Sequence, residues 1–181
     1  MHSFANQFKL AAVALTLAST GASAQTLQRF DMAKLPLAEF NLQGGSFIAQ
    51  LFEASYPYRS QLLIECQDCT TTNDALVGLV AAEANEVADF TANPDRYVRQ
   101  VKAVCLTQAQ NCAFEKASRD GLNGYAYVAQ YEDGVIAVEH TYFSNGLLFV
   151  INAVSMSEDI SRANVETLID VASPYVTGKK K

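Results

Sequence analysis

Four cysteines are the residues of this chain whose type and spacing bear most directly on chemistry. They stand as a C-x2-C pair, Cys66 and Cys69, and a C-x6-C pair, Cys105 and Cys112. An even number of cysteines in an exported chain favours disulfides, and four cysteines allow three pairings. The spacing does not choose among the pairings, although a local bridge within each pair is geometrically easy if the pair brackets a turn. We therefore predict that these four residues form a structural disulfide framework.

Thiol–disulfide exchange by Cys66 and Cys69 is the alternative use of the first pair. Thioredoxin-type oxidoreductases place their reactive C-x-x-C pair between a strand and a helix, because the helix N-terminus lowers the pKa of the attacking thiol. Here Asp68 puts a carboxylate beside the thiols, which would raise their pKa. The expected helix cap, Thr72 or Asn73, lies several residues beyond the second cysteine. The helix dipole would therefore be poorly aimed at the thiols.

A four-cysteine zinc site is a third way to use the same residues. The C-x2-C spacing is usual for zinc ligands, but C-x6-C is wider than typical. An oxidising compartment also favours disulfides over thiolates. We therefore expect no metal ion, and the sequence offers no motif for another cofactor.

Histidine chemistry rests on His140, because His2 precedes the cleavage site that we expect. A single histidine excludes a multi-histidine metal site and the H-E-x-x-H motif. Glu139 adjoins His140, but adjacent strand residues point to opposite faces of a sheet, so the two cannot form a working pair. We expect His140 to lie in the core or at its rim, with a role as general base or pH-sensitive binding residue as the alternative. No residue is predicted to be catalytic.

Residues 1–24 have the layout of a secretory signal peptide. A weakly basic start is followed by the short apolar run LAAVALTL and by the small-residue ending Ala22-Ser23-Ala24. The apolar run is far shorter than the roughly 20 residues of a membrane-spanning helix. We expect cleavage before Gln25, a single domain over residues 25–181, and a periplasmic or secreted protein without a membrane span.

The charge balance narrows the choice of partners. The chain carries 13 basic and 19 acidic residues, for a net charge of −6. Three of the lysines stand in the basic tail at residues 178–181, so the rest of the chain is more acidic still. Binding to nucleic acid or to anionic membranes rests on clustered positive charge. We therefore expect a protein partner or a small ligand instead.

Three runs rich in β-branched and aromatic residues occupy the C-terminal half. They are YAYVAQY (125–131), VIAVEHTYF (135–143) and LLFVINAVS (147–155). Asp133-Gly134 and Asn145-Gly146 separate the runs, and both dipeptides tolerate the positive φ of a type I′ hairpin turn. The pattern predicts a three-stranded antiparallel meander over residues 125–155.

Two-residue turns would also fix the register of this meander. Glu132 would stand opposite Val135, which brings Tyr127 opposite His140, and the second turn would bring His140 opposite Ile151. One sheet face would then carry an aromatic set that is our candidate binding face: Tyr125, Tyr127, Tyr131, His140 and Tyr142. If the terminal helix covers the other face, this set forms an exposed site for a partner or ligand, and packing in the core is the alternative.

Helical spacing of apolar residues predicts a C-terminal helix over about 160–173, ended by Pro174. Central helices are expected over about 73–90 and about 94–105, and Asn93 suits the cap of the second. Upstream, residues 46–55 and 60–66 suggest a strand hairpin. Residues 113–120, just before the meander, suggest either a further strand or the tail of the preceding helix. This order of elements predicts the α+β class with an antiparallel sheet.

Together these features predict an exported, disulfide-stabilised domain without a catalytic site of its own. We interpret it as a binding, accessory or inhibitory protein. The alternative functions are thiol–disulfide exchange at Cys66 and Cys69, and a small-ligand carrier that uses the aromatic sheet face.

Overall fold

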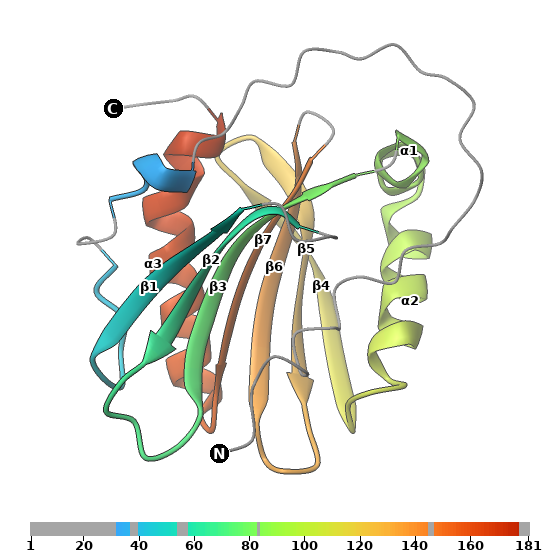
Figure 1. Ribbon diagram of the computed structural model, residues 1–181. Coiled ribbons are helices and arrows are strands. Elements are labelled where there is room, and N and C mark those ends of the chain that lie inside the picture. Colours follow the sequence, from blue (N-terminus) through green and yellow to red (C-terminus); the bar gives the residue numbers. More distant parts are fainter. Residues whose placement is uncertain (1–31, 37–39, 54–57, 83, 145–146, 178–181) are drawn as a thin grey trace.

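The computed structural model (Figure 1) describes residues 32–36, 40–53, 58–82, 84–144 and 147–177. The expected signal peptide at residues 1–24 and the basic tail at 178–181 lie outside the described residues.

One antiparallel sheet organises the fold, with the strand order β1-β2-β3-β7-β6-β5-β4. Two local units build it, the hairpins β1–β3 and the meander β4–β7, and pairing of β3 with β7 joins them. The strands are β1 (Phe47–Glu53), β2 (Tyr58–Cys66), β3 (Asn73–Ala81), β4 (Asn111–Arg119), β5 (Leu122–Gln130), β6 (Ile136–Ser144) and β7 (Leu147–Ser155). The predicted meander and the predicted N-terminal hairpin are both confirmed, and residues 113–120 fall largely in a strand.

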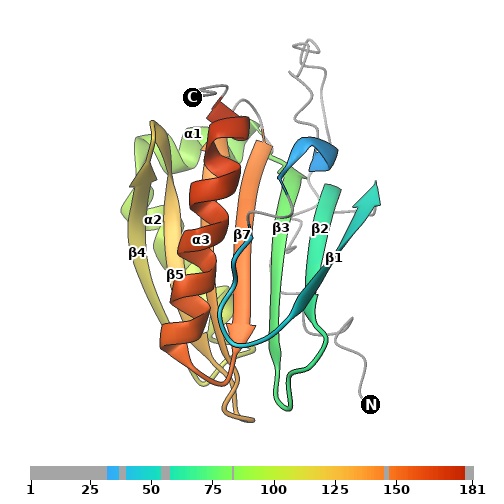
Figure 2. The ribbon, with the colours of Figure 1, turned by 90° about the vertical axis from the view of Figure 1, so that its left-hand side faces the viewer.

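Helices lie on both faces of the sheet (Figures 1 and 2). Helix α3 (Glu158–Thr177) covers one face, while α1 (Ala84–Ala92) and α2 (Pro94–Cys105) lie on the other. The α+β class and the C-terminal helix on the sheet are as predicted. Helix α2 also has the predicted start, because the side chain of Asn93 accepts a hydrogen bond from the backbone N–H of Arg96 at 3.1 Å.

Each face of the sheet has its own core. Under α3, the fully buried Val165 and Leu168 belong to the same cluster as Phe149 and Ile151 of the sheet. Met32 of a short 3-10 helix (Met32–Lys34) and the following Leu35 also belong to this cluster. Under α1 and α2, aromatic side chains dominate: Phe90, Tyr97, Phe114, Tyr125, Tyr127 and Phe143. Each face therefore has a buried core: the one under α3 includes residues of β2, β3, β6 and β7, and the one under α1 and α2 lies on β4–β7.

The predicted helix over 73–90 is wrong in its first half. Residues Asn73–Ala81 form β3, and only Ala84–Ala92 is helical. β3 lies between β2 and β7, so its apolar side chains are buried on both faces. Such a strand reads as an unbroken apolar run, which periodicity alone cannot distinguish from a buried helix.

The C-terminal helix runs past its predicted end at Pro174 and stops at Thr177. A proline removes the hydrogen bond from its own nitrogen to the carbonyl four residues earlier. Here that carbonyl belongs to Asp170, an exposed residue in the last turns of the helix. The position near the helix end keeps the cost of the missing bond low.

The register across the first meander turn also differs from the prediction. The loop has three residues, Glu132 to Gly134, and it is closed by a hydrogen bond from Tyr131 N–H to the Val135 carbonyl at 2.9 Å. Gly134 has φ of +82°, as in a type I turn followed by a glycine bulge. The extra residue brings Tyr127 opposite Glu139 in place of His140.

The second turn has the predicted register, with His140 opposite Ile151. A shift of one residue moves every side chain of a strand to the other face. The error at the first turn therefore separates the tyrosines of β5 from His140 and Tyr142 of β6, and the predicted single aromatic face is wrong.

Replacement of Gly134 tests the bulge. Gly134→Ala should lower the free energy of unfolding by about 1–2 kcal/mol, because a Cβ disfavours the left-handed backbone. Gly134→Asn should cost less, since asparagine tolerates this conformation. Urea unfolding followed by circular dichroism measures both. Equal losses for the two variants would argue against a left-handed residue in this turn.

Candidate functional site

The predicted disulfides are present, and of the three possible pairings the structure has the one with two local bridges. Cys66 bonds Cys69 with a Cα–Cα distance of 5.7 Å, and Cys105 bonds Cys112 with a Cα–Cα distance of 6.3 Å. No cysteine is left free. The second bridge is buried and ties the end of α2 to β4.

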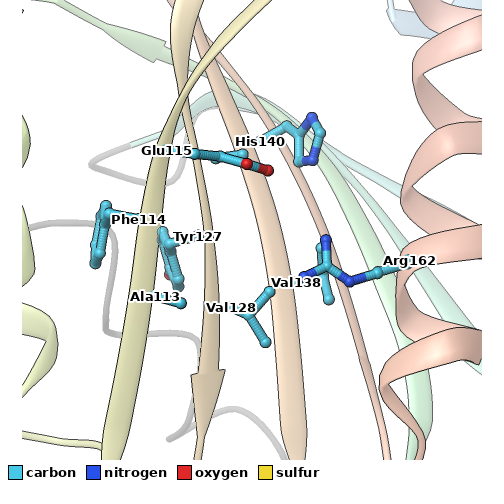
Figure 3. A pocket seen from close by; sticks show the side chains of 9 residues that line it. Ala113, Phe114, Glu115, Tyr127, Val128, Val138, His140 and Arg162 are labelled. Atoms are coloured by element: carbon cyan, nitrogen blue, oxygen red, sulfur yellow. The ribbon is translucent and has the colours of Figure 1, made fainter.

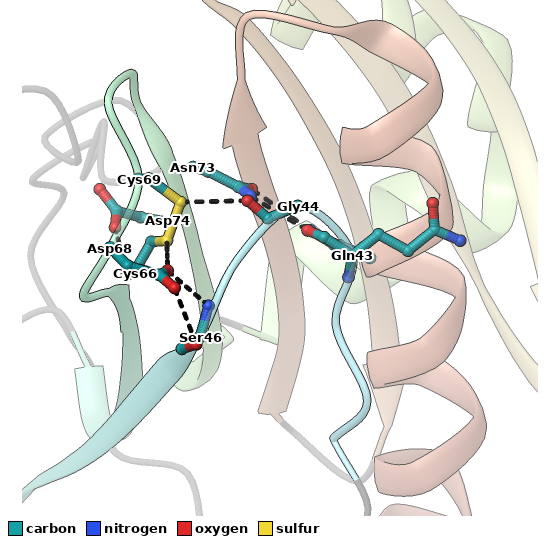
Figure 4. Close-up of a disulfide and its surroundings, with 9 residues drawn as sticks. Gln43, Gly44, Ser46, Cys66, Asp68, Cys69, Asn73 and Asp74 are labelled. Carbon is teal, nitrogen blue, oxygen red and sulfur yellow. Dashed lines mark hydrogen bonds between the residues drawn. A yellow bond between two sulfur atoms is a disulfide. The ribbon is translucent and has the colours of Figure 1, made fainter.

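The Cys66–Cys69 disulfide joins the end of β2 to the β2–β3 connection, and the residues before β1 lie beside it (Figure 4). The Asp68 carboxylate accepts hydrogen bonds from the Ser46 backbone N–H at 2.7 Å and from the Ser46 hydroxyl at 2.9 Å. These bonds lower the pKa of Asp68. A Cβ on Gly45 would lie 2.4 Å and 2.6 Å from the two sulfur atoms, so only glycine fits there. The disulfide thus closes the β2–β3 connection, and Asp68 within it holds the start of β1 through Ser46.

The surroundings of this disulfide lack what the redox alternative needs. No helix starts after Cys69, because the following element is strand β3. The helix dipole that would stabilise a thiolate is therefore missing at this place. The Asp68 carboxylate, whose Oδ1 lies 3.6 Å from the Cys66 sulfur, would oppose thiolate formation. Cys66, Asp68 and Cys69 offer three metal-ligand atoms close together, but both sulfurs are already bonded to each other.

The residues of the predicted binding face are divided between the two sides of the sheet. Tyr125 and Tyr127 belong to the buried cluster under α1 and α2, and the half-buried Tyr131 packs against it. Tyr142 lies on the α3 side and is 2% exposed. His140 is half-buried on that same side. A ligand role for any of them stays a prediction.

An open hollow of about 100 Å³ lies between strands β4–β6 and helix α3 (Figure 3). Two neighbouring rungs of the sheet line it: Ala113, Val128 and Val138 in one, and Glu115, Ala126 and His140 in the next. The apolar side chains of these rungs form its floor. The small Ala126 stands between two longer side chains and deepens the floor. Because α3 packs mainly on β6 and β7, the adjoining surface of β4 and β5 is left accessible.

Three polar side chains approach this hollow from three elements (Figure 3). Glu115 comes from β4, His140 from β6 and Arg162 from α3. Glu115 and Arg162 are exposed. Arg162 also forms an ion pair along its own helix, with both Nε and Nη2 at 2.8 Å from Oε1 of Glu158. The hollow therefore combines an apolar floor with a carboxylate, a guanidinium and an imidazole at its rim.

His140 is held in place by a neighbouring tyrosine. Its Nδ1 lies 3.1 Å from the hydroxyl oxygen of Tyr142, which is a hydrogen-bond distance. Burial lowers the pKa of His140, against the opposing effect of Glu166 and Glu115. The imidazole is therefore neutral at neutral pH, and its second nitrogen can serve as one donor or one acceptor.

Glu139 forms a separate polar cluster on the opposite face of the sheet. Its side chain is 4% exposed and accepts hydrogen bonds from the hydroxyls of Tyr127 and Thr141, each at 3.0 Å, and from the Asn152 amide at 3.4 Å. Burial nevertheless raises the pKa of Glu139. The Asn152 Oδ1 is buried without a hydrogen-bond partner. No lysine or arginine among the described residues pairs with this carboxylate.

Glu139→Gln tests the energetic role of this cluster. Since the pKa of Glu139 is raised above its ordinary 4.5, its contribution to stability is complete below that pH and is lost as the pH rises through the folded-state pKa. Relative to the variant, the wild type should lose about 1–3 kcal/mol of unfolding free energy between about pH 4 and about pH 8. The glutamine amide can also donate to Asn152 Oδ1.

Urea unfolding at several pH values measures this difference. Glu132→Gln, on the exposed first turn of the meander, is the control with the same chemical change. Parallel stability curves for wild type and Glu139→Gln would contradict the raised pKa.

Of the three rim residues of the hollow, the sequence pattern indicated His140 but not Glu115 or Arg162. The position of Glu115 follows from the pairing of β4 with β5, which brings it into the same rung as Ala126 and His140. The position of Arg162 depends on where α3 packs, for which the sequence offers no comparable signal.

These features define an α+β protein with helices on both sides of one sheet, two local disulfides and a small polar hollow. No known family model matches the chain, and no curated protein is significantly similar to it. None of the described helices is both long and apolar enough to cross a membrane.

Proposed function

We propose that this protein is exported and works as a disulfide-stabilised binding protein, with the hollow beside α3 as its ligand site. The observation that supports this best is the approach of Glu115, His140 and Arg162 to a common alkyl floor. A few polar groups placed around apolar surface are typical of ligand sites. The two disulfides are compatible with export, and the net charge of −6 disfavours nucleic acid as the partner.

The size and charge of the hollow indicate the class of ligand. A volume of about 100 Å³ is small beside the roughly 300–1,000 Å³ of sites for drug-sized molecules. Glu115 and Arg162 belong to different elements and carry opposite charges, so a small zwitterion can satisfy both. The alkyl floor suits a short aliphatic group. Short amino acids such as L-alanine combine these properties.

The ion pair of Arg162 with Glu158 does not prevent Arg162 from binding a ligand carboxylate. An exposed pair at i,i+4 spacing contributes only about 0.3–0.5 kcal/mol, and a ligand carboxylate can compete with it at that cost. A guanidinium carries five N–H donors, of which Glu158 engages those on Nε and Nη2. Donors therefore remain for a ligand carboxylate.

A titration followed by two-dimensional NMR tests the site with three matched probes: L-alanine, propionate and ethylamine. L-alanine should shift the amide signals of Ala113, Glu115 and Ala126 saturably, with a Kd of about 1 mM. Propionate and ethylamine each lack one charge and should bind about fivefold more weakly or less. These differences would show that both charges of the zwitterion are recognised.

Arg162→Gln should weaken L-alanine binding by about fivefold, which corresponds to roughly 1 kcal/mol. Arg96→Gln, at an exposed position on α2, makes the same charge change and should leave the binding unaffected. Absence of saturable shifts with all three probes would overturn the ligand site. Equal effects of the two arginine variants would show that only overall charge matters.

Intact-mass measurement of the purified native protein tests the export proposal. The mass should correspond to a chain that begins at Gln25, and alkylation without reductant should add nothing because all four sulfurs are bonded. Retention of residues 1–24, or alkylation of the native protein, would contradict export with structural disulfides. Labelling confined to Cys66 and Cys69 after mild reduction would favour thiol exchange instead.

A further inference from the structure

The β4 edge of the sheet is shielded by charge and by a helix. Lys116 forms an ion pair with Asp95 of α2 at 2.8 Å, and Arg119 pairs with Glu166 and Asp170 of α3. Helix α2 lies beside this strand (Figure 1). Charged side chains and a neighbouring helix hinder the addition of another strand to a sheet edge. β4 is therefore a closed edge.

The β1 edge lacks such shielding within the described structure. Its sequence FIAQLFE has a single charged residue, Glu53, at the end of the strand. Ile48, Leu51 and Phe52 are 42%, 39% and 40% exposed. Figure 2 shows β1 at the outer end of the sheet, and β2 is its one strand neighbour among the described residues. An exposed apolar edge of this kind is a template for another strand.

The backbone of β1 can be divided into two sets of hydrogen-bonding groups. The backbone N–H of Gln67 donates to the Ser46 carbonyl at 2.8 Å, in line with the register of β1 on β2. In an antiparallel ladder such hydrogen-bonded positions alternate. The even-numbered residues of β1 therefore direct their N–H and C=O groups toward β2. The odd-numbered residues direct theirs to the open side.

From these observations we infer that β1 pairs antiparallel with β1 of a second copy of this chain, about a two-fold axis at Gln50. A symmetric pairing must set odd-numbered residues opposite odd-numbered ones, so that outward-directed groups meet. The axis at Gln50 does this and pairs all seven residues of the strand. The two sheets then form one continuous sheet through the dimer.

The side-chain pairs that this register creates across the axis are favourable. Ile48 stands opposite Phe52 of the second copy, on both sides of the axis, which gives two apolar cross-strand pairs. The two Gln50 amides meet at the axis, and each can donate to and accept from the other. Glu53 stands opposite Phe47, so no two like charges face each other.

The edge is also held ready for pairing. The hydrogen bonds between Ser46 and Asp68 and the adjacent disulfide fix the residues that lead into β1. A strand fixed in its bound conformation loses less conformational entropy on association. This gives the Cys66–Cys69 bridge a second role, as a support for the interface.

Light scattering coupled to size-exclusion chromatography tests the dimer on the full chain as the cell processes it. The wild type should elute with twice the mass of one chain. Gln50→Lys places two ammonium groups opposite each other at the axis and should raise the dissociation constant at least tenfold. Gln100→Lys, at an exposed position on α2, makes the same charge change and should remain dimeric.

Cysteine cross-linking tests the register. Across the axis the Gln50 Cα atoms would be about 4.5 Å apart, within the roughly 4.4–6.8 Å that a disulfide spans. Gln50→Cys should therefore form a disulfide-linked dimer on oxidation. Ile48→Cys lies on the same face and is similarly exposed, but its symmetry mate is about 13 Å away, so it should not cross-link.

Three outcomes would overturn the inference. They are a monomeric wild type at about 100 μM, a dimer that survives Gln50→Lys unchanged, and cross-linking of Ile48→Cys as efficient as that of Gln50→Cys. Circular dichroism spectra identical to the wild type show that each variant is folded. Because the ligand hollow lies by β4 at the other edge of the sheet, these outcomes are independent of the L-alanine titration.

Discussion

Pairing of β3 with β7 is the interaction on which the rest of the structure depends. Nine residue pairs, from Asn73 with Ser155 to Ala81 with Leu147, connect two units that are otherwise local hairpins. Residues at the middle of this seam, Val77 and Ile151, are fully buried. Without the seam each unit would have an additional open edge, and the apolar stripe of α3 would cover only half of its core.

Much of this architecture is predictable from local signals. The Asn145-Gly146 dipeptide predicts a turn between the last two strands, and Asn93 predicts the start of α2. The even number of cysteines predicts disulfides but leaves three pairings open, of which the structure contains the one with two local bridges. These features depend on short stretches of chain, where turn chemistry and capping determine the outcome.

What the sequence did not predict depends on contacts between distant segments. The residues of β3 resemble a helix in sequence because a strand buried on both faces has no alternating pattern. The Asp133-Gly134 signal identified a turn but not its length, and one extra residue changed which side chains share a face. The hollow combines residues of β4, β5, β6 and α3, so it emerges only when the register of three strands and the place of a helix are known.

A second long-range contact accompanies the seam. Asn164 of α3 is fully buried and holds the backbone of Gln43, accepting from its N–H at 2.6 Å and donating to its carbonyl at 3.2 Å. Asn73 of β3 donates to the same carbonyl at 3.0 Å. The segment before β1 is thus fixed by residues from the middle and the end of the chain.

The central position of β7 has a consequence for how the chain is made. A polypeptide that leaves a ribosome or a translocation pore N-terminus first delivers β1–β3 long before residues 147–155. The inner edge of β3 and the apolar face beneath α3 have no native cover during that interval. The first half of the chain therefore exposes an unpaired strand edge and an apolar face until the last third has been made, which is the kind of intermediate that is prone to aggregation.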